Sequence, residues 1–326
     1  MEATSMLSLM GADSEIPPVK RPAISPEIAV GSEIELEIGP VAHGGHFIAH
    51  HQGITIFVRG TDEGERVIAE ITNVTKKIAR AQVVKVLKAS GNRITPKCQY
   101  FIDQACGGCD FQHLTLRHQQ ELKVKVVRES LRRIGGIEIE PVLIDVKSDG
   151  FDWRTRMGFA ISPGRRVSLF RHRSKSMTEI QRCEIAAHEI DIHLINQKLA
   201  KLDSEGKLRL ASKINAGIDS EGFSHLSIDS PTSKMNQIRM RVFDEVFEIS
   251  LESFWQPHRN AAEHLVERMQ SQLEVRGDDL VLDLYGGVGL FTAFIRKKLA
   301  DSGRVTMIES DPVAISDAKR KSREII

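Results

Sequence analysis

Four cysteines restrict the fold of this chain more than any other feature. Cys98, Cys106 and Cys109 form a C-x7-C-x2-C group, and Cys183 stands alone further along. Such spacing is typical of four thiolates that hold an iron–sulfur cluster or a tetrahedral zinc ion. Gly107 and Gly108, between two of the cysteines, allow the backbone to curl around a bulky centre. The alternative is four unrelated buried thiols, but the spacing favours a metal site.

The composition predicts a globular protein of two or three domains. The chain has 326 residues, a formal net charge of +1 and 41% hydrophobic residues. No apolar run approaches the length of a membrane helix, and the first residues lack the pattern of a secretory signal. Residues 1–29, with four prolines, are expected to form a flexible lead-in. A reducing cytoplasm would suit thiolates that are held by metal.

Basic residues cluster beside the cysteines. Residues 152–182 contain eight Lys or Arg against Asp152 and Glu179, and residues 114–134 contain six against two acids. This distribution indicates a surface for a polyanion such as RNA. A solvated helix face and a charged hairpin would give the same pattern. The candidate RNA-binding residues are Arg154, Arg156, Arg171 and Arg173.

The segment after the lead-in predicts a small barrel. Ile34, Leu36 and Ile38 alternate with glutamates, the period of a half-buried strand. Four more short strands are expected at 46–50, 53–58, 65–71 and 81–86, separated by glycine-rich turns. Five short strands in so short a segment indicate an antiparallel barrel of the OB kind over residues 30–90.

Residues 91–250 predict a mixed α+β middle domain that contains all four cysteines. A helix over 114–134 should stop at Gly135-Gly136. A hairpin should turn at Pro163-Gly164. A second helix over 188–202 and strands over 223–228, 237–242 and 245–249 complete the prediction.

From residue 251 the pattern becomes that of an α/β domain, predicted over 251–326. Pro257 should begin an amphipathic helix that runs to residue 273. The run L-V-L-D-L over 280–284 predicts a buried strand, followed by a glycine turn and a helix. A second strand over 305–308 ends in Glu309, and a helix follows from Pro312.

The glycine turn and the acid after the second strand indicate a nucleoside site. Glycines allow a ligand to approach the backbone, and an acid such as Glu309 can bind both ribose hydroxyls. A dinucleotide site expects a third glycine where this chain has Thr292. Asp283 suits a methionine ammonium better than a pyrophosphate, so the pattern favours S-adenosylmethionine (SAM). A structural turn without a ligand is the alternative.

Together these parts resemble one family. A small barrel precedes P-x-C…C-G-G-C-x-x-Q-H, a remote fourth cysteine, S-F-W-Q and D-L-Y-G-G-V-G-L-F. In this order they are similar to the SAM-dependent RNA uracil-5-methyltransferases, which act on tRNA or large-subunit rRNA. The resemblance implies three parts: an OB-like RNA-binding barrel called a TRAM domain, a middle domain with a metal cluster, and a Rossmann-like methyltransferase domain.

The resemblance also implies roles for single residues. Cys98, Cys106, Cys109 and Cys183 match the ligands of a [4Fe–4S] cluster, although the spacing before Cys106 is longer than in the family pattern. The residues that match the SAM pocket are Gln256, Asp283, Tyr285, Gly287, Gly289, Leu290 and Glu309.

The family's catalytic cysteine and base follow the glycine turn, and no cysteine follows Cys183 among these residues. We therefore expect no catalytic residue within this chain and an incomplete methyltransferase domain, with the nucleophile and base beyond Ile326. A missing C-terminal fragment is then a possible partner, and otherwise a monomer is expected. The alternatives are a non-catalytic RNA-binding protein with a zinc or iron–sulfur site, and a methyltransferase that acts on protein or small molecules.

Overall fold

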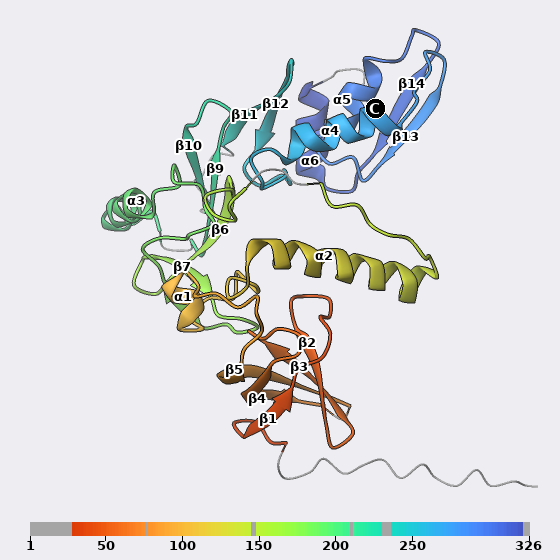
Figure 1. Ribbon diagram of the computed structural model, residues 1–326. Coiled ribbons are helices and arrows are strands. Elements are labelled where there is room, and N and C mark those ends of the chain that lie inside the picture. Colours follow the sequence, from red (N-terminus) through yellow and green to blue (C-terminus); the bar gives the residue numbers. More distant parts are fainter. Residues whose placement is uncertain (1–27, 76, 145–147, 209–210, 230–235, 322–326) are drawn as a thin grey trace, which may run out of the picture. The chain divides into compact units, whose positions relative to one another are not determined.

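The computed structural model describes residues 28–75, 77–144, 148–208, 211–229 and 236–321. The predicted lead-in lies almost wholly outside these residues. The chain divides into two compact units, with the main division after Ser90. Each unit is coloured along the sequence in Figure 1.

The first unit is a five-stranded barrel. Its strands are β1 (Glu33–Glu37), β2 (Phe47–His51), β3 (Ile54–Arg59), β4 (Arg66–Val74) and β5 (Ile78–Lys88), paired in the order β1-β4-β5-β3-β2. The backbone after β1 joins the far edge: Gly39 N–H donates to Ile48 O, and Ile48 N–H donates to Pro40 O. These bonds close the sheet. The five strands confirm the prediction, except that β3 and β5 run parallel, so the barrel is not fully antiparallel.

The predicted helix after the third cysteine is confirmed. Helix α2 spans Leu116–Ser130 and continues as one π-helical turn, η1, over Leu131–Gly135. Gly136, with φ of +63°, ends it in the left-handed region that glycine adopts without strain. A short helix, α1 (Gln99–Ile102), which the sequence did not predict, follows Cys98.

A five-stranded sheet with the order β10-β9-β6-β7-β8 forms the middle of the second unit. Its strands are β6 (Arg156–Ile161), β7 (Val167–Phe170), β8 (Met177–Glu179), β9 (Lys213–Ile218) and β10 (Ser224–Ile228). The predicted hairpin is the β6–β7 pair, whereas β8 and β9 were not predicted. Helix α3 (Ile192–Ser204) packs its apolar face on this sheet, around Ile195 and Leu199.

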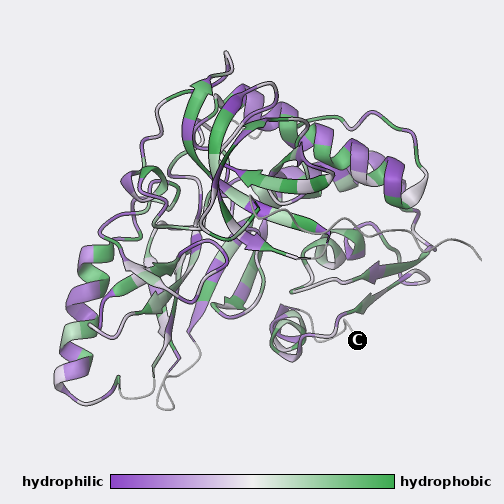
Figure 2. Ribbon diagram, turned by 90° about the horizontal axis from the view of Figure 1, so that it is seen from below, coloured by the Kyte–Doolittle hydropathy of each residue, from purple (hydrophilic) through white to green (hydrophobic). Residues whose placement is uncertain are grey.

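The predicted strands at 237–242 and 245–249 pair as the hairpin β11 (Gln237–Val242) and β12 (Glu245–Ser250). Helix α4 spans Ala261–Gln272, so the expectation that Pro257 begins it was wrong. The Pro257 carbonyl instead accepts hydrogen bonds from the backbone and hydroxyl of Thr155. Hydrophilic and hydrophobic residues alternate along the helices in Figure 2, which is the pattern of amphipathic helices.

The last elements form the predicted α/β unit. Strands β13 (Leu280–Leu284) and β14 (Arg304–Ile308) run parallel, joined by α5 (Leu290–Arg296), and α6 (Pro312–Lys321) follows. The strand itself is confirmed, but the expectation that it is buried was wrong. Among the described residues β13 pairs only with β14, and its Leu280, Leu282 and Leu284 are exposed.

Candidate cofactor, metal and RNA sites

The glycine turn links the end of β13 to the start of α5. Gly287 and Gly289 have φ of +59° and +83°, the region that favours glycine. Gly286 is required for another reason, because a Cβ there would lie 2.4 Å from Cγ of Met307 in β14. The two parallel strands therefore approach the turn too closely for a larger residue.

Glu309 closes the turn from the end of the neighbouring strand. Its Oε2 accepts a hydrogen bond from the Gly287 N–H at 2.9 Å, and its Oε1 accepts from the N–H groups of Ser310 and Asp311. Hydrogen bonds from the backbone of Asp311, Gly287 and Ser310 hold the pKa of Glu309 below its usual value. The carboxylate is thus charged at neutral pH and keeps lone pairs for further donors.

Asp283 lies buried beneath the turn. Its Oδ2 accepts from the Thr292 N–H at 3.1 Å and from the Thr292 hydroxyl at 2.5 Å. Thr292 is itself fully buried in the first turn of α5. Thr292, which stands where a dinucleotide site would have its third glycine, therefore binds Asp283, the acid ahead of the turn. The sequence pattern singled out both positions but not their contact.

The other predicted cofactor residues surround the same turn. Tyr285 is 89% exposed and has φ of +59°, unusual for a residue with a side chain. Leu290 begins α5 and packs against a buried cluster that contains Val288 of the turn and Trp255. Gln256 follows Trp255 and is half-buried. The structure thus brings the S-F-W-Q segment and the glycine turn to one core.

A cleft of about 320 Å³ is lined in part by Trp255. Its lining includes Phe243, Arg241 and Arg259 but none of the seven predicted cofactor residues. Residue pattern rather than size therefore locates the cofactor candidate, because the glycine turn and the Glu309 carboxylate bound to it lie outside the cleft.

The loop with three cysteines docks on the β7–β8 hairpin. The Gly107 N–H donates to Phe170 O at 2.9 Å, and the Thr178 hydroxyl donates to Ala105 O at 2.7 Å. A Cβ at Gly107 would lie 2.6 Å from Cα of His172, so glycine permits this approach. The predicted curl around a centre has a second purpose, which is contact with the hairpin backbone.

The four cysteines lie within electrostatic reach of one another. Burial raises the pKa of Cys109 to about 11, and Cys183, Cys106 and Cys98 add to this rise, whereas a hydrogen bond from Gln112 opposes it. Burial likewise raises the pKa of Cys183, which Cys106 and Cys98 also raise. Cys98 and Cys183, which are 85 positions apart in sequence, therefore lie within range of each other's charge.

The donor set suits a thiophilic metal. The Gly108 N–H donates to Sγ of Cys106 at 3.3 Å, and the N–H groups of Ile185 and Ala186 donate to Cys183. Such bonds to sulfur stabilise a ligating thiolate. In the described parts of the chain, no three His, Cys, Asp or Glu side chains converge closely enough to form a metal site as they stand.

The four arginines predicted to bind RNA divide into two groups. Arg171 and Arg173 are exposed in the connection between β7 and β8, beside the cysteine loop. Arg154 is half-buried, and its guanidinium lies over the Trp153 ring while Nε donates to Arg156 O.

Arg156 differs from the other three. It is only 9% exposed, and its Nη2 donates to the carbonyls of Ser250, Leu251 and Ser253 at 2.8 to 3.1 Å. Burial lowers its pKa to about 10, which still leaves it charged at neutral pH. The structure places Arg156 in the core rather than on a surface that RNA can reach.

Comparisons with known proteins agree with these parts. Residues 28–84 match the TRAM domain family. An uncharacterized RNA methyltransferase of Streptomyces coelicolor is 33% identical, across 92% of this chain and 73% of that protein. A 23S rRNA (uracil(1939)-C(5))-methyltransferase of Shewanella piezotolerans is 28% identical, across 89% and 73%.

A solved structure shares the fold. The tRNA (uracil-54, C5)-methyltransferase of Pyrococcus abyssi, in complex with S-adenosyl-L-homocysteine, superposes with a TM-score of 0.65 at 20% identity. The match covers 87% of this chain and 76% of that one. Within the described residues, no helix is both long enough and apolar enough to cross a membrane.

Proposed function

The chain belongs to a family of RNA methyltransferases, and from this premise we propose that it serves the SAM-dependent methylation of uracil C5 in tRNA or large-subunit rRNA. The observation that supports this most is the parallel strand–turn–helix–strand unit with Glu309 bound to the turn. A relative and a solved structure of the same fold are both named for uracil C5.

In the proposed cofactor site, each residue supplies one contact. Glu309 binds the ribose hydroxyls, and the free lone pairs of Asp283 face the ammonium group of the methionine part. Gly287 and Gly289 let the backbone approach the ligand, and Leu290 and Tyr285 contribute apolar surface. Gln256 contacts the cofactor from the S-F-W-Q segment. SAM supplies the methyl group from its sulfonium.

We assign Cys98, Cys106, Cys109 and Cys183 to a [4Fe–4S] cluster. The support is that Cys109 and Cys183 lie within range of the charges of the other cysteines, and that N–H groups are directed at sulfur. The cluster's role is structural, because methyl transfer to uracil changes no oxidation state. It would join the loop at 98–109 to the end of the β7–β8 hairpin. Four cysteines that form no disulfide and hold a metal suit a cytoplasmic protein.

The proposed RNA surface is the tip of the β7–β8 hairpin with Arg171 and Arg173, extended by Arg154. Phe170 and Met177 pair across this hairpin and are both exposed. Cations beside an exposed ring favour a single-stranded nucleotide, which needs both phosphate contacts and stacking. Arg156 is left out of this surface because its guanidinium is engaged in the core.

The proposal is tested in cells that lack the gene. Nucleosides from purified tRNA and rRNA are quantified by mass spectrometry, and one 5-methyluridine should disappear and return when the gene is restored. A 5-methyluridine content that is unchanged in both RNA classes would contradict the uracil assignment. Mapping the lost position then identifies the RNA.

A further inference from the structure

A buried polar network holds the segment that precedes the predicted cofactor residue Gln256. We propose that Asp317 and Arg156 are positioning residues for cofactor binding. They fix Ser250–Ser253 from two sides, so that the next three residues, Phe254–Gln256, keep one place beside the glycine turn. We call these three residues the Phe254–Gln256 arch. The inference rests on the proposed SAM site and deepens it.

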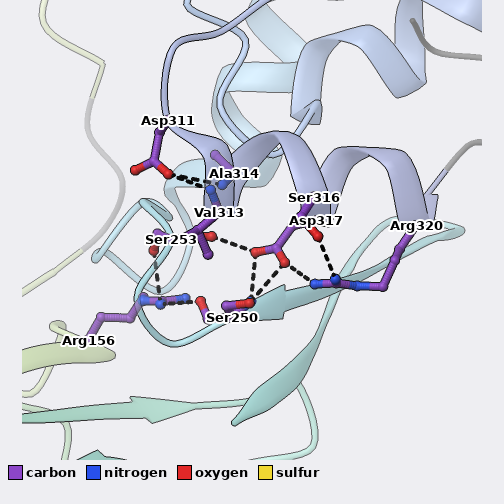
Figure 3. Close-up of polar contacts among 9 residues, drawn as sticks. All are labelled: Arg156, Ser250, Ser253, Asp311, Val313, Ala314, Ser316, Asp317 and Arg320. Carbon is purple, nitrogen blue, oxygen red and sulfur yellow. Dashed lines mark hydrogen bonds and ion pairs between the residues drawn. The ribbon is translucent and has the colours of Figure 1, made fainter. Parts of the chain in front are cut away.

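Asp317 holds the segment by accepting hydrogen bonds from its N–H and hydroxyl groups. Its Oδ2 accepts from the Ser250 N–H at 2.7 Å and from the Ser253 hydroxyl, and its Oδ1 accepts from the Ser250 hydroxyl at 2.9 Å. Figure 3 shows these bonds and the Arg320 guanidinium that also binds the carboxylate. Asp317, Ser250 and Ser253 are all buried. A buried carboxylate costs free energy unless its lone pairs are satisfied, and here they are.

Arg156 holds the same segment by donating hydrogen bonds to its carbonyl oxygens. Its Nη2 donates to the carbonyls of Ser250 and Ser253, which are drawn in Figure 3, and to that of Leu251. Donors and acceptors of one short segment are thus satisfied by two side chains from β6 and α6, which are 161 residues apart in sequence. The positive charge of Arg156 and the negative charge of Asp317 also attract each other, which offsets part of the free-energy cost of burying them.

The other end of the arch is held as well. The Thr155 N–H donates to Pro257 O at 2.7 Å, and the Arg259 N–H donates to Trp153 O at 3.1 Å. Between these two anchors, Trp255 points into the core with Val288, whereas Phe254 is exposed and Gln256 is half-buried. The arch is therefore a three-residue span with fixed ends and an outward side.

Asp317 also connects the arch to Glu309. Helix α6 begins at Pro312, three residues after Glu309, and Asp311 caps it by accepting from the N–H groups of Val313 and Ala314. Asp317 lies on the same helix. A shift of α6 would move Glu309 and the arch together, so that the two sides of the proposed cofactor site keep their spacing.

The first test is Asp317→Asn. The amide keeps the volume but presents N–H groups where Ser250 and Ser253 donate, so the segment loses acceptors. We expect the full chain to bind S-adenosylhomocysteine about tenfold more weakly by calorimetry, which corresponds to about 1.4 kcal/mol. Ser253→Ala removes one donor and should weaken binding by a smaller factor. RNA affinity should not change in either variant.

Lys321→Ala is the matched control. Lys321 lies on the same helix and binds Glu245 of β12, so its loss loosens α6 without touching Ser250–Ser253. It should lower the thermal midpoint but not the affinity for S-adenosylhomocysteine. Amide hydrogen exchange over residues 250–258 should rise in Asp317→Asn and not in the control.

The possible results separate two failures. If the wild-type chain does not bind S-adenosylhomocysteine, the proposed cofactor site is wrong. If the wild-type chain binds it, and Asp317→Asn and Ser253→Ala bind equally well, the positioning role is overturned. Equal losses of affinity in Lys321→Ala and Asp317→Asn would overturn it too, because they would reflect general stability. Should Asp317→Asn fail to fold, Ser253→Ala decides.

Discussion

The Glu309 carboxylate accepts a hydrogen bond from the Gly287 N–H at 2.9 Å, which joins the end of β14 to the glycine turn after β13. The contact fixes the acid at the place where a nucleoside would meet the turn. It also means that one carboxylate orders its own binding site before a ligand arrives, which reduces the entropy that binding must overcome.

Replacement of this acid tests the site directly. Glu309→Gln keeps the shape but removes the negative charge that binds two ribose hydroxyls. We expect the dissociation constant for S-adenosylhomocysteine to rise about tenfold, in the range of a lost charge-assisted hydrogen bond. Glu274→Gln, at an exposed residue after α4, is the control. Calorimetry on both variants decides, and equal affinities would exclude Glu309 from the site.

The pH dependence follows from the lowered pKa of Glu309. Backbone hydrogen bonds hold this pKa below the ordinary value of 4.5. The stabilisation they provide is therefore complete above pH 4.5 and is lost as pH falls through the lower folded-state pKa. The affinity for S-adenosylhomocysteine should therefore stay constant from neutral pH down to about pH 4.5. A decline between pH 7 and 5 that disappears in Glu309→Gln would contradict the lowered pKa.

The metal centre is tested by Cys183→Ser. Anaerobic purification of the wild-type chain should give a brown protein with about four irons, as one [4Fe–4S] cluster requires. The serine variant should lose iron and unfold at a lower temperature, because the remote ligand joins two segments. Glu184→Gln, next to the ligand, should retain the metal. A colourless protein with one zinc per chain would favour the tetrahedral alternative.

The docking of the cysteine loop is tested by a substitution that changes no proposed metal ligand. Gly107→Ala would place a Cβ 2.6 Å from Cα of His172. This Cα is a backbone atom, so it cannot move aside without a shift of the hairpin. We expect a loss of about 1–3 kcal/mol in the free energy of unfolding, as overpacking typically costs. Gly91→Ala is matched, since its Cβ would meet no atom within 4 Å. Denaturant titrations of the two proteins should differ, and coincident curves would refute the close approach.

The RNA surface is tested by salt dependence. The double variant Arg171→Ala and Arg173→Ala should bind RNA more weakly and show a shallower dependence of log affinity on log salt. Each lost phosphate contact reduces the slope by about 0.7 to 0.9. Arg268→Ala, on the exposed face of α4, serves as control. Filter binding over a salt series measures both quantities, and an unchanged slope would remove the hairpin from the RNA surface.

Sequence patterns predicted the parts of this fold whose cause is local. The β1 alternation, the Gly135-Gly136 stop and the glycine turn all appear where expected. The family assignment is confirmed as well, because an RNA methyltransferase is 33% identical across 92% of this chain. Strand β9 was missed because its burial depends on β6 and β10, which are distant in sequence.

The role of Arg156 shows what sequence could not predict. A basic cluster assigns charge to a region but not to a surface, and Arg156 turns inward to three carbonyls almost a hundred residues away. Pro257 shows the same limit. Its position suggested a helix start, but its carbonyl accepts hydrogen bonds from Thr155, and α4 begins only at Ala261.

Thr292 has a consequence for any attempt to change the ligand class of the turn. A glycine there would complete the pattern of dinucleotide sites, yet it would remove the hydroxyl that satisfies buried Asp283. Asp283 would keep the backbone N–H of residue 292 but lose one of its two donors, and this buried carboxylate would then favour a proton or a water molecule over the anionic pyrophosphate it would have to face. Conversion of the cofactor preference therefore requires at least a paired exchange at positions 283 and 292, because a substitution at either position alone removes a hydrogen-bond partner from the other.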